Sequence, residues 1–540
     1  MLHAPGVLAV PCLATALITG EQALILPFAL TILVSIGVGQ AGYHARLRKG
    51  DDAPGSARLA GLAVAWLLAS AIATLPFLWA GEAAITAEAA RAYGTPMTAF
   101  FEAMSGLTTT GLTMSADPSA LPYTLQLWRS MLQWGGGVGI VLLAALVLHP
   151  GVALKPLYVS EVSLEAPEGL GPHRIAVRLL SIYAGLTLAS ALALAAAGMP
   201  AWEALNHGIT GLATGGFSVK PDSFIGYSAP IKVVAVFVML VGATSFAVHY
   251  RLLVARDPRA LKSRQLYVFI ALVTAGAIVI AALNELYTGE PGFADALFDS
   301  MSALGTVGFS GAAVSDWHPT YVPLLLVAMI IGAQMGSTGG GIKLERVIQI
   351  VLGIVRGFRK EHIIKPDTLT EDSVTTGSGD TTDSDDDPKE GVAVTSRADR
   401  NALRLFWQAS VVAWLYLVTL ALGTFALLLC VGETKPFLDV FFEATSALGT
   451  VGYSTGLTSP DLGPAGLVVL IGLMWAGRLE LLALIVLLLL LVFHAGQLTF
   501  PATPAPSLAP TGSDGSGSVD ADADEDGSIL RRARLARGGE

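Results

Sequence analysis

The chain has 540 residues, of which 53% are hydrophobic and only 14% are charged. Soluble domains carry roughly 25% charged residues, so the composition excludes an ordinary soluble domain. The apolar runs are long enough to cross a bilayer, and we expect an all-α integral membrane protein. The formal charge of −10 is concentrated in two polar segments: residues 366–399 carry −8 and residues 514–526 carry −6, which leaves the remainder at +4.

The N-terminal apolar stretch from Val7 to Val38 is interrupted at Gly20 and Glu21, which predicts a pair of membrane helices. No charged segment precedes the stretch and Arg46 follows it, so we do not interpret it as a signal peptide. Eight further apolar runs bring the predicted spans to ten. These runs are residues 59–80, 125–148, 175–198, 231–254, 266–287, 322–355, 405–431 and 465–495.

Lysine and arginine are concentrated in every second connection between the predicted spans, which indicates the cytoplasmic side. This pattern places both termini in the cytoplasm of a multi-pass protein of the cytoplasmic membrane. The residues are Arg46, Arg48, Lys49 and Arg58; Lys155, Arg174 and Arg178; Arg251, Arg256, Arg259, Lys262 and Arg264; and Arg356, Arg359, Lys360, Arg400 and Arg404.

The other connections each hold a short apolar stretch followed by a glycine-containing motif, which is typical of a re-entrant helix and loop. The motifs are MSGLTTTGLT (104–113), ITGLATGGFS (209–218), MSALGTVGFS (301–310) and TSALGTVGYS (445–454). In all four motifs a threonine lies two residues before the shared glycine. Because all four copies start on the same side, we predict four parallel repeats of span, pore loop and span in a pseudo-fourfold arrangement.

We therefore divide the chain into seven parts. Both polar segments are poor in large apolar residues and rich in Ser, Thr, Gly and Asp, which predicts disorder. The parts are an N-terminal helix pair (1–50), repeat 1 (51–155), repeat 2 (156–260), repeat 3 (261–365), an acidic disordered cytoplasmic linker (366–399), repeat 4 (400–498) and a disordered cytoplasmic tail (499–540).

The motif composition suits a cation filter. A dehydrated K⁺ needs several oxygens in place of its water, and inward-facing backbone carbonyls supply them without a fixed counter-charge. An extended loop with its carbonyls on one side needs unusual dihedral angles, which glycine adopts at little steric cost. Simple turns between helices are the alternative for any one loop, but four copies in register favour a shared function.

Polar residues, most of them acidic, recur at two positions before the glycines. Thirteen residues before lie Glu203, Asp295 and Asp439, which we expect to cap the short helices. Nine residues before lie Glu102, His207, Asp299 and Glu443, which either anchor the loop from behind or add negative potential to the pore. Another acidic residue follows each glycine by six to nine positions. It either concentrates cations at the outer mouth of the pore or only keeps the loop soluble. These residues are Asp117, Asp222, Asp316 and Asp461.

Two features lie outside the loops. Arg478 interrupts the last apolar run, where an unpaired arginine costs at least about 2.5–3.5 kcal/mol on insertion scales, so we expect a function for it. The segment GAQMGSTGGGIK (332–343) breaks the eighth predicted span with five glycines. It is not a phosphate-binding P-loop, because Ile342 follows Gly341, and it either lines a cavity or only kinks the helix.

The motif and its fourfold repetition resemble the Trk/Ktr/HKT superfamily of K⁺ transport proteins, and the additional N-terminal pair resembles the TrkH type. The resemblance covers about residues 5–498 and implies K⁺ uptake, with K⁺ bound at filter residues. These are Thr109, Thr110, Gly111, Thr214, Gly215, Gly216, Thr306, Val307, Gly308, Thr450, Val451 and Gly452.

The resemblance also implies a gate beneath the filter, with Arg478 as an electrostatic barrier. The gate residues are Gly336, Ser337, Thr338, Gly339, Gly340 and Gly341. Relatives pair two pore subunits and bind a TrkA-type nucleotide-binding regulator, so we expect a homodimer, such a partner and no nucleic acid. The loops are not TVGYG and differ from one another, so we expect K⁺ preference with incomplete exclusion of Na⁺.

Three alternatives to a K⁺ uptake pore remain at this point. A Na⁺-permeable or weakly selective cation pore fits the same pattern. A carrier built from inverted repeats conflicts with the parallel orientation of the four copies. A membrane enzyme would need facing acids, histidines or metal ligands in the spans, and the sequence offers none apart from Arg478 and Glu480, so we predict neither catalysis nor a cofactor.

Overall fold

The computed structural model of the chain describes residues 1–49, 55–147, 172–288, 292–312, 317, 319–361 and 397–479. The chain divides into two units, Met1–Gln497 and Leu498–Glu540, of which the second lies outside the described residues. All regular elements in the described part are helices, so the all-α prediction is confirmed there. The predicted tail and nearly all of the predicted acidic linker lie outside the described residues.

The N-terminal half of the helical unit begins with the predicted pair, separated at Gly20, whose φ is +74°. The helices are α1 Ala4–Thr19, α2 Gln22–Lys49, α3 Gly55–Ala73, α4 Leu75–Glu82, α5 Ala87–Tyr93, α6 Pro96–Leu107, α7 Tyr123–Val147, α9 Pro172–Ala196, α10 Ala201–Leu212, α11 Ala229–Ala243 and α12 Phe246–Leu253, with the 3₁₀ helices η1 Pro118–Ala120 and η2 Pro258–Lys262.

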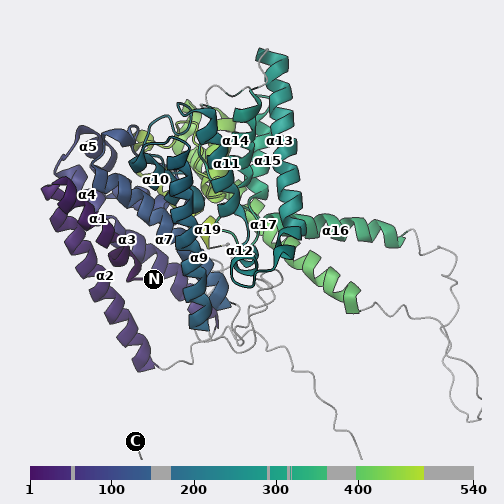
Figure 1. Ribbon diagram of the computed structural model, residues 1–540, viewed down its shortest axis with the longest axis horizontal. Coiled ribbons are helices and arrows are strands. Elements are labelled where there is room, and N and C mark those ends of the chain that lie inside the picture. The colour runs from purple at the N-terminus through teal and green to yellow at the C-terminus, as the bar shows by residue number, and fades with distance from the viewer. Residues whose placement is uncertain are drawn as a thin grey trace, which may run out of the picture. The chain divides into compact units, whose positions relative to one another are not determined.

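The C-terminal half contains the longest described helix, α17, which includes the last three residues of the predicted disordered linker, 397–399. Its helices are α13 Arg264–Thr288, α14 Phe293–Leu304, α15 Val322–Ile331, α16 Leu344–Glu361, α17 Arg397–Val431, α18 Phe437–Leu448 and α19 Pro464–Arg478, with η5 Gly432–Thr434 and η6 Pro460–Leu462. The helices that surround each loop pack together: α6 contacts α3 and α7, α9 contacts α10, and α17 contacts α18 and α19. Helices α13 and α14 lie side by side in Figure 1 and are also in contact.

Five helices of the described part are long and apolar enough to cross a membrane, or six if a bent pair counts as one span. The bent pair is α11 and α12, which meet at 98°. The apolar run 231–254 predicted one continuous span here, so the bend at Thr244 and Ser245 is a difference from the sequence-based expectation. Three shorter apolar helices are α1, α15 and α19.

Large apolar side chains lie on the outside of several helices as well as in the interior. On α17, for example, Trp414, Leu422 and Leu429 are 69%, 64% and 72% exposed. Soluble proteins rarely expose contiguous apolar surface of this kind, and a bilayer is the solvent that would favour it. Aromatic contacts pack helices together in the interior. One example is the edge-to-face pair of Phe28 and Trp128, which joins α2 to α7.

Candidate ion-binding ring

Each of the four predicted pore loops follows a helix of 12 residues that ends at a leucine: α6, α10, α14 and α18. The helices end in the same way. The amide three residues beyond the leucine donates to the carbonyl five residues back at 2.9 Å in every copy. This 6→1 bond and the 5→2 bond beside it define a Schellman C-cap. The pairs are Thr110–Ser105, Gly215–Thr210, Val307–Ser302 and Val451–Ser446.

A Schellman cap places its C′ residue in the left-handed region, where glycine is usual. Here the C′ residue is the motif threonine in every copy, with φ between +50° and +52° at Thr109, Thr214, Thr306 and Thr450. A non-glycine residue there costs about 1–2 kcal/mol. Such strain persists only where the surroundings enforce it, and it clusters at functional sites. The hydroxyl oxygens of Thr109 and Thr450 are buried without a hydrogen-bond partner among the described residues.

The shared glycines bring the four loops into a closed ring. Their φ values are +88° at Gly111, +76° at Gly216, +84° at Gly308 and +101° at Gly452. A Cβ added at each would lie 2.0–2.3 Å from a carbonyl oxygen of the next loop, so no side chain fits. The oxygens belong, in the same order, to Gly215, Val307, Val451 and Thr110, which closes the circle from the fourth loop to the first.

The residues nine before the glycines hold the loops from behind. In three copies the carboxylate accepts from the amide three residues after the glycine: Glu102 from Met114 at 2.8 Å, Asp299 from Gly311 at 2.8 Å and Glu443 from Thr455 at 3.0 Å. In the second copy the ring of His207 bonds the Ser218 hydroxyl at 3.0 Å. All four side chains are buried, so of the two alternatives the structure has the anchoring one.

Sequence reasoning missed a stripe of polar residues on α7, which lies at helical spacing and is buried against the second loop. Gln133 donates to the Gly215 carbonyl at 2.5 Å and accepts from the Phe217 amide at 3.1 Å. Arg129 donates to the Ser218 carbonyl at 2.7 Å and to Glu102 at 2.8 Å. The signal was present in the sequence, since Gln126, Arg129, Ser130 and Gln133 are the polar residues of an apolar run.

The segment 332–343 leaves α15 and returns to nearly the same point, because the Ile342 and Lys343 amides donate to the Ile330 and Ile331 carbonyls at 2.9 and 3.0 Å. Gly332 and Gly341 have φ of +75° and +77°. They lie so close together that a Cβ on either one would collide with the backbone of the other. The segment is therefore a closed loop with a glycine neck. Lys343, at φ +84°, is buried and donates to the Gly339 carbonyl.

This loop lies against the bend between α11 and α12 and against the ring. The Phe246 amide donates to the Gly336 carbonyl at 2.8 Å, and the single hydroxyl hydrogen of Thr338 is shared between the Leu212 and Gly242 carbonyls, each 3.0 Å from Oγ1. The Gly340 amide donates to Thr306 Oγ1 at 2.7 Å. The hydrogen bonds to the loop thus account for the break in α11–α12, which no local residue signalled.

Arg478 joins three parts of the chain at this level. From the last residue of α19 its guanidinium donates to the Thr338 carbonyl at 2.8 Å and to the Gly136 carbonyl of α7 at 2.7 Å. The side chain is only 3% exposed. The predicted gate residues and the predicted barrier residue are therefore in direct contact, while Glu480, its neighbour in the motif, lies outside the described residues.

Glycines on three of the second helices fit against the ends of the loop helices. A Cβ at Gly136, Gly242 or Gly477 would lie 2.2, 2.5 or 2.0 Å from the carbonyl oxygen of Leu107, Leu212 or Leu448 respectively. The missing side chains at these glycines thus permit close packing of the second helices against the loop helices.

The acids thirteen residues before the glycines form no side-chain cap, contrary to expectation. Glu203 and Asp295 do lie in the first turns of their helices, but Glu203 accepts from the Tyr227 hydroxyl at 2.5 Å and Asp295 pairs with Lys232 at 2.7 Å. Asp117 caps η1 through the Ser119 amide at 3.1 Å. Among the described residues, no group of His, Cys, Asp and Glu could hold a metal ion.

The fold and this ring of four loops define the class: an all-helical transport protein of the membrane, not an enzyme. A family model described as "TrkH: Cation transport protein" matches residues 27–492, and the chain belongs to the TrkH family. An uncharacterized cation transporter of Methanocaldococcus jannaschii is 30% identical over 442 residues, which are 81% of this chain and 83% of that protein.

Two further similarities concern named Trk proteins. The Trk system potassium uptake protein TrkH of Halomonas elongata is 35% identical over 356 residues, which cover 62% of this chain and 68% of that protein. The crystal structure of the potassium transporter TrkH from Vibrio parahaemolyticus matches with a TM-score of 0.71 and 25% identity, covering 90% of this chain and 98% of that chain.

Proposed function

We propose that the chain takes up K⁺ across the cytoplasmic membrane through a central pore whose filter is the ring of four loops. The observation that carries the proposal is the ring itself: four strained threonines and four glycines, each glycine held against a carbonyl of the next loop. Relatives named as potassium uptake proteins support K⁺ as the transported ion. Carbonyl oxygens, with the partnerless hydroxyls of Thr109 and Thr450, are the ligands that a dehydrated K⁺ would use.

The membrane arrangement that we propose has ten spans, in four parallel repeats after the N-terminal pair, with both termini in the cytoplasm. The five or six clear apolar helices and three shorter ones support it in part. Because α1, α15 and α19 have only 16, 10 and 15 described residues, they would cross together with adjoining residues. Residues 480–497, which continue the last apolar run, lie outside the described part.

We further propose that the loop 332–343 is the gate and that Arg478 is both its tether and an electrostatic barrier below the filter. The two hydrogen bonds of the guanidinium support this, since they hold the loop at Thr338 and α7 at Gly136 together. A buried cation beneath the ring also repels a permeating cation. A homodimer and a TrkA-type nucleotide-binding regulator are part of the same proposal, through the family resemblance.

The competing function is a Na⁺-permeable or weakly selective cation pore. Uptake of ⁸⁶Rb⁺ and ²²Na⁺ into proteoliposomes that contain the purified chain separates the two. We expect Rb⁺ flux to exceed Na⁺ flux, and equal fluxes would refute K⁺ preference.

The substitution Gly308→Ser tests the filter itself. Its Cβ would lie 2.0 Å from the Val451 carbonyl oxygen, so the ring must open at that point. We expect the Rb⁺/Na⁺ flux ratio to fall towards one and rescue of a K⁺-uptake-deficient strain to fail. Gly463→Ser is the matched control, because Gly463 has a similar φ of +82° but nothing within 4 Å of its added Cβ. An unchanged flux ratio in Gly308→Ser would refute the filter assignment.

A further inference from the structure

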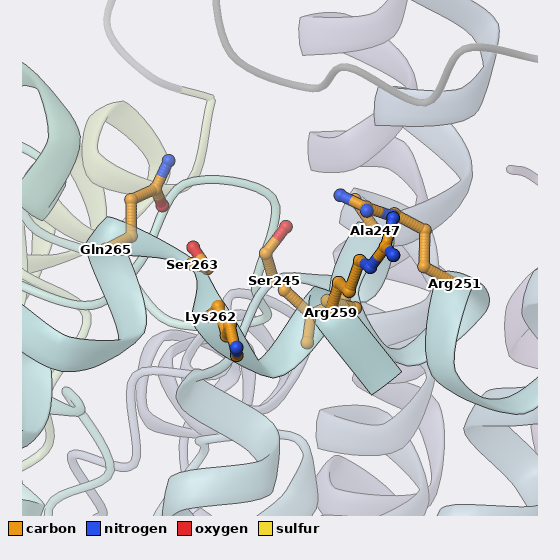
Figure 2. A pocket seen from close by; sticks show the side chains of 9 residues that line it. Ser245, Ala247, Arg251, Arg259, Lys262, Ser263 and Gln265 are labelled. Atoms are coloured by element: carbon orange, nitrogen blue, oxygen red, sulfur yellow. The ribbon is translucent and has the colours of Figure 1, made fainter. Parts of the chain in front are cut away.

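A basic pocket lies where α12, η2 and α13 meet, away from the ring. Its volume is about 230 Å³, and the polar side chains that line it are Ser245, Arg251, Arg259, Lys262, Ser263 and Gln265. Figure 2 shows the two arginines on one side of Ser245, and Lys262, Ser263 and Gln265 on the other. No carboxylate is among the lining residues. Three cationic side chains thus surround a space that a small anion can enter.

Of the three cationic side chains in the pocket, one is neutralised by a carboxylate and two are not. Arg251 pairs with Asp257 at 2.6 Å, and the hydrogen bond from Arg251 is the main reason that the pKa of Asp257 is lowered. Asp257 therefore stays ionised at neutral pH and balances Arg251. The side chains of Arg259 and Lys262 are exposed and form no ion pair within the described ranges. The pocket consequently keeps a net charge of about +2 from its side chains.

The backbone adds positive potential from two directions. Both α12 and α13 begin at the pocket, after Ser245 and Ser263, which line it. The first amides of a helix have no intrahelical acceptor, and the positive end of the helix dipole favours an anion there. At α12 the Phe246 amide already donates to the Gly336 carbonyl, so α12 contributes mainly its dipole and α13 its first amides. Convergence of two helix N-termini with arginine and lysine side chains is a common way of binding phosphate.

Gln265 adds a side-chain amide to the pocket wall. Cationic side chains and amides are the groups with which proteins bind phosphate, so the pocket chemistry fits a phosphate group.

We propose that this pocket binds a phosphate group, carried by the headgroup of an anionic phospholipid or by a soluble phosphate compound. The site is contiguous with the gate loop, because the Ser245 amide donates to Gln334 Oε1 at 3.4 Å and the Phe246 amide to the Gly336 carbonyl at 2.8 Å. The bound phosphate would thus stabilise the bend on which the gate loop rests. Any effect on ion flux rests on the proposed transport function, whereas binding itself does not.

The test measures binding through thermal stability, since a ligand that binds only the folded state raises the unfolding midpoint. The full chain in a non-ionic detergent is titrated with inorganic phosphate, against chloride at equal ionic strength, and with short-chain phosphatidylglycerol, against short-chain phosphatidylcholine. The variant is R259Q/K262Q. The matched control is R174Q/R404Q, which removes two other exposed charges that have no ion pair within the described ranges.

We expect at least one phosphate source to raise the midpoint of the wild type and of R174Q/R404Q, and R259Q/K262Q to need at least about tenfold more ligand for half the effect. A response to phosphatidylglycerol alone would assign a lipid headgroup, and a response to inorganic phosphate a soluble ligand. No shift in the wild type, equal shifts in both double variants, or equal effects of the two lipids would overturn the proposal.

A second variant guards against a folding defect in R259Q/K262Q. Ser263→Asp keeps a good residue at the start of α13 while adding a carboxylate to the pocket. We expect it to fold and to lose the ligand-induced shift, and a wild-type response in this variant would contradict the site. Because the readout is binding, its failure would leave the proposed K⁺ transport untouched, and failed transport would leave this result standing.

Discussion

The four loops of the ring share one backbone geometry, whereas the helices directly beneath them differ from one another. In the ring, the 6→1 capping bond is 2.9 Å in all four copies, and the threonine φ values agree within 2°. Beneath it, α7 continues as a helix of 25 residues, whereas α11 turns by 98° into α12 and α15 stops at Ile331. The cap geometry is the same in all four loops, which we call the symmetric level, and the helices beneath them differ, which we call the asymmetric layer.

This difference follows from what each level would have to do under the proposed function. A filter must offer an ion equal oxygens from all sides, so its four copies are held to one geometry. A gate needs an element with two arrangements, and one movable loop suffices. The asymmetric layer is therefore where control belongs, and substitutions in the two levels should have different signatures.

Arg129→Met should have the largest effect, because it breaks the link between the first loop and the second. It leaves the Glu102 carboxylate buried without its charged partner, and breaking such a pair costs about 3–5 kcal/mol. We expect a large loss of folding free energy in denaturant unfolding of the detergent-solubilised chain. The double variant Arg129→Met/Glu102→Gln should recover part of it. A loss below about 1 kcal/mol would show that the link carries little.

Gly452→Ala attacks the symmetry of the ring at the junction of the fourth and first loops. The added Cβ would lie 2.3 Å from the Thr110 carbonyl oxygen, and the backbone is strained at φ +101°. We expect the Rb⁺/Na⁺ flux ratio to fall. Gly456→Ala isolates the collision from the strain, since φ is +83° there and nothing lies within 4 Å. If both variants changed the ratio equally, the collision would not be the cause.

Arg478→Gln acts on the asymmetric layer and should leave selectivity intact. It removes the charge and weakens the bonds to the Gly136 and Thr338 carbonyls, so we expect the initial rate of Rb⁺ uptake to rise, by roughly tenfold per 1.4 kcal/mol of lost barrier. Arg478→Lys keeps the charge but not the two-armed geometry, and should give an intermediate rate. Unchanged uptake in both variants would argue against a gate at this residue.

Thr338→Val should have the smallest effect of the four. The substitution keeps the shape but removes the hydroxyl that donates to the Leu212 and Gly242 carbonyls, at about 1 kcal/mol for a typical bond. We expect a rise in uptake of a few fold at an unchanged Rb⁺/Na⁺ ratio. Thr424→Val is the control, because it loses a buried hydroxyl bond within α17, away from the loop. A change in the ratio for Thr338→Val would mean that the two levels are not separable.

The symmetric level was predictable from sequence and the asymmetric one much less so. Counting back from the glycines predicted the loops and the positions of Glu102, His207, Asp299 and Glu443, because repetition makes a local pattern visible. The interruption of the N-terminal apolar stretch predicted the break at Gly20. The bend in α11–α12 was not predictable. The residues around Thr244 and Ser245 are small and contain no proline, and the hydrogen bonds that fix the bend come from residues about 90 positions later.

The cap expectation failed for a related reason. Position in the first turn was correctly deduced for Glu203 and Asp295. Their partners come from other parts of the chain, because Tyr227 lies in the loop before α11 and Lys232 lies on α11, well before Asp295 in the sequence. Sequence offers no distance between such elements. The buried stripe of α7 was visible as spacing, yet an isolated polar stripe does not tell which neighbouring loop it supports.

The close contact of each ring glycine with the next loop predicts how substitutions at the four glycines combine. A side chain at each glycine would collide with a carbonyl oxygen of the next loop, so a substitution disturbs the next loop as well as its own. Effects of substitutions at adjacent glycines should therefore be non-additive, and those at opposite glycines, such as Gly111 and Gly308, closer to additive. Non-additive pairs of substitutions would therefore identify neighbouring loops. Measuring all double variants at the four glycines would give the order of the loops around the ring without a structure.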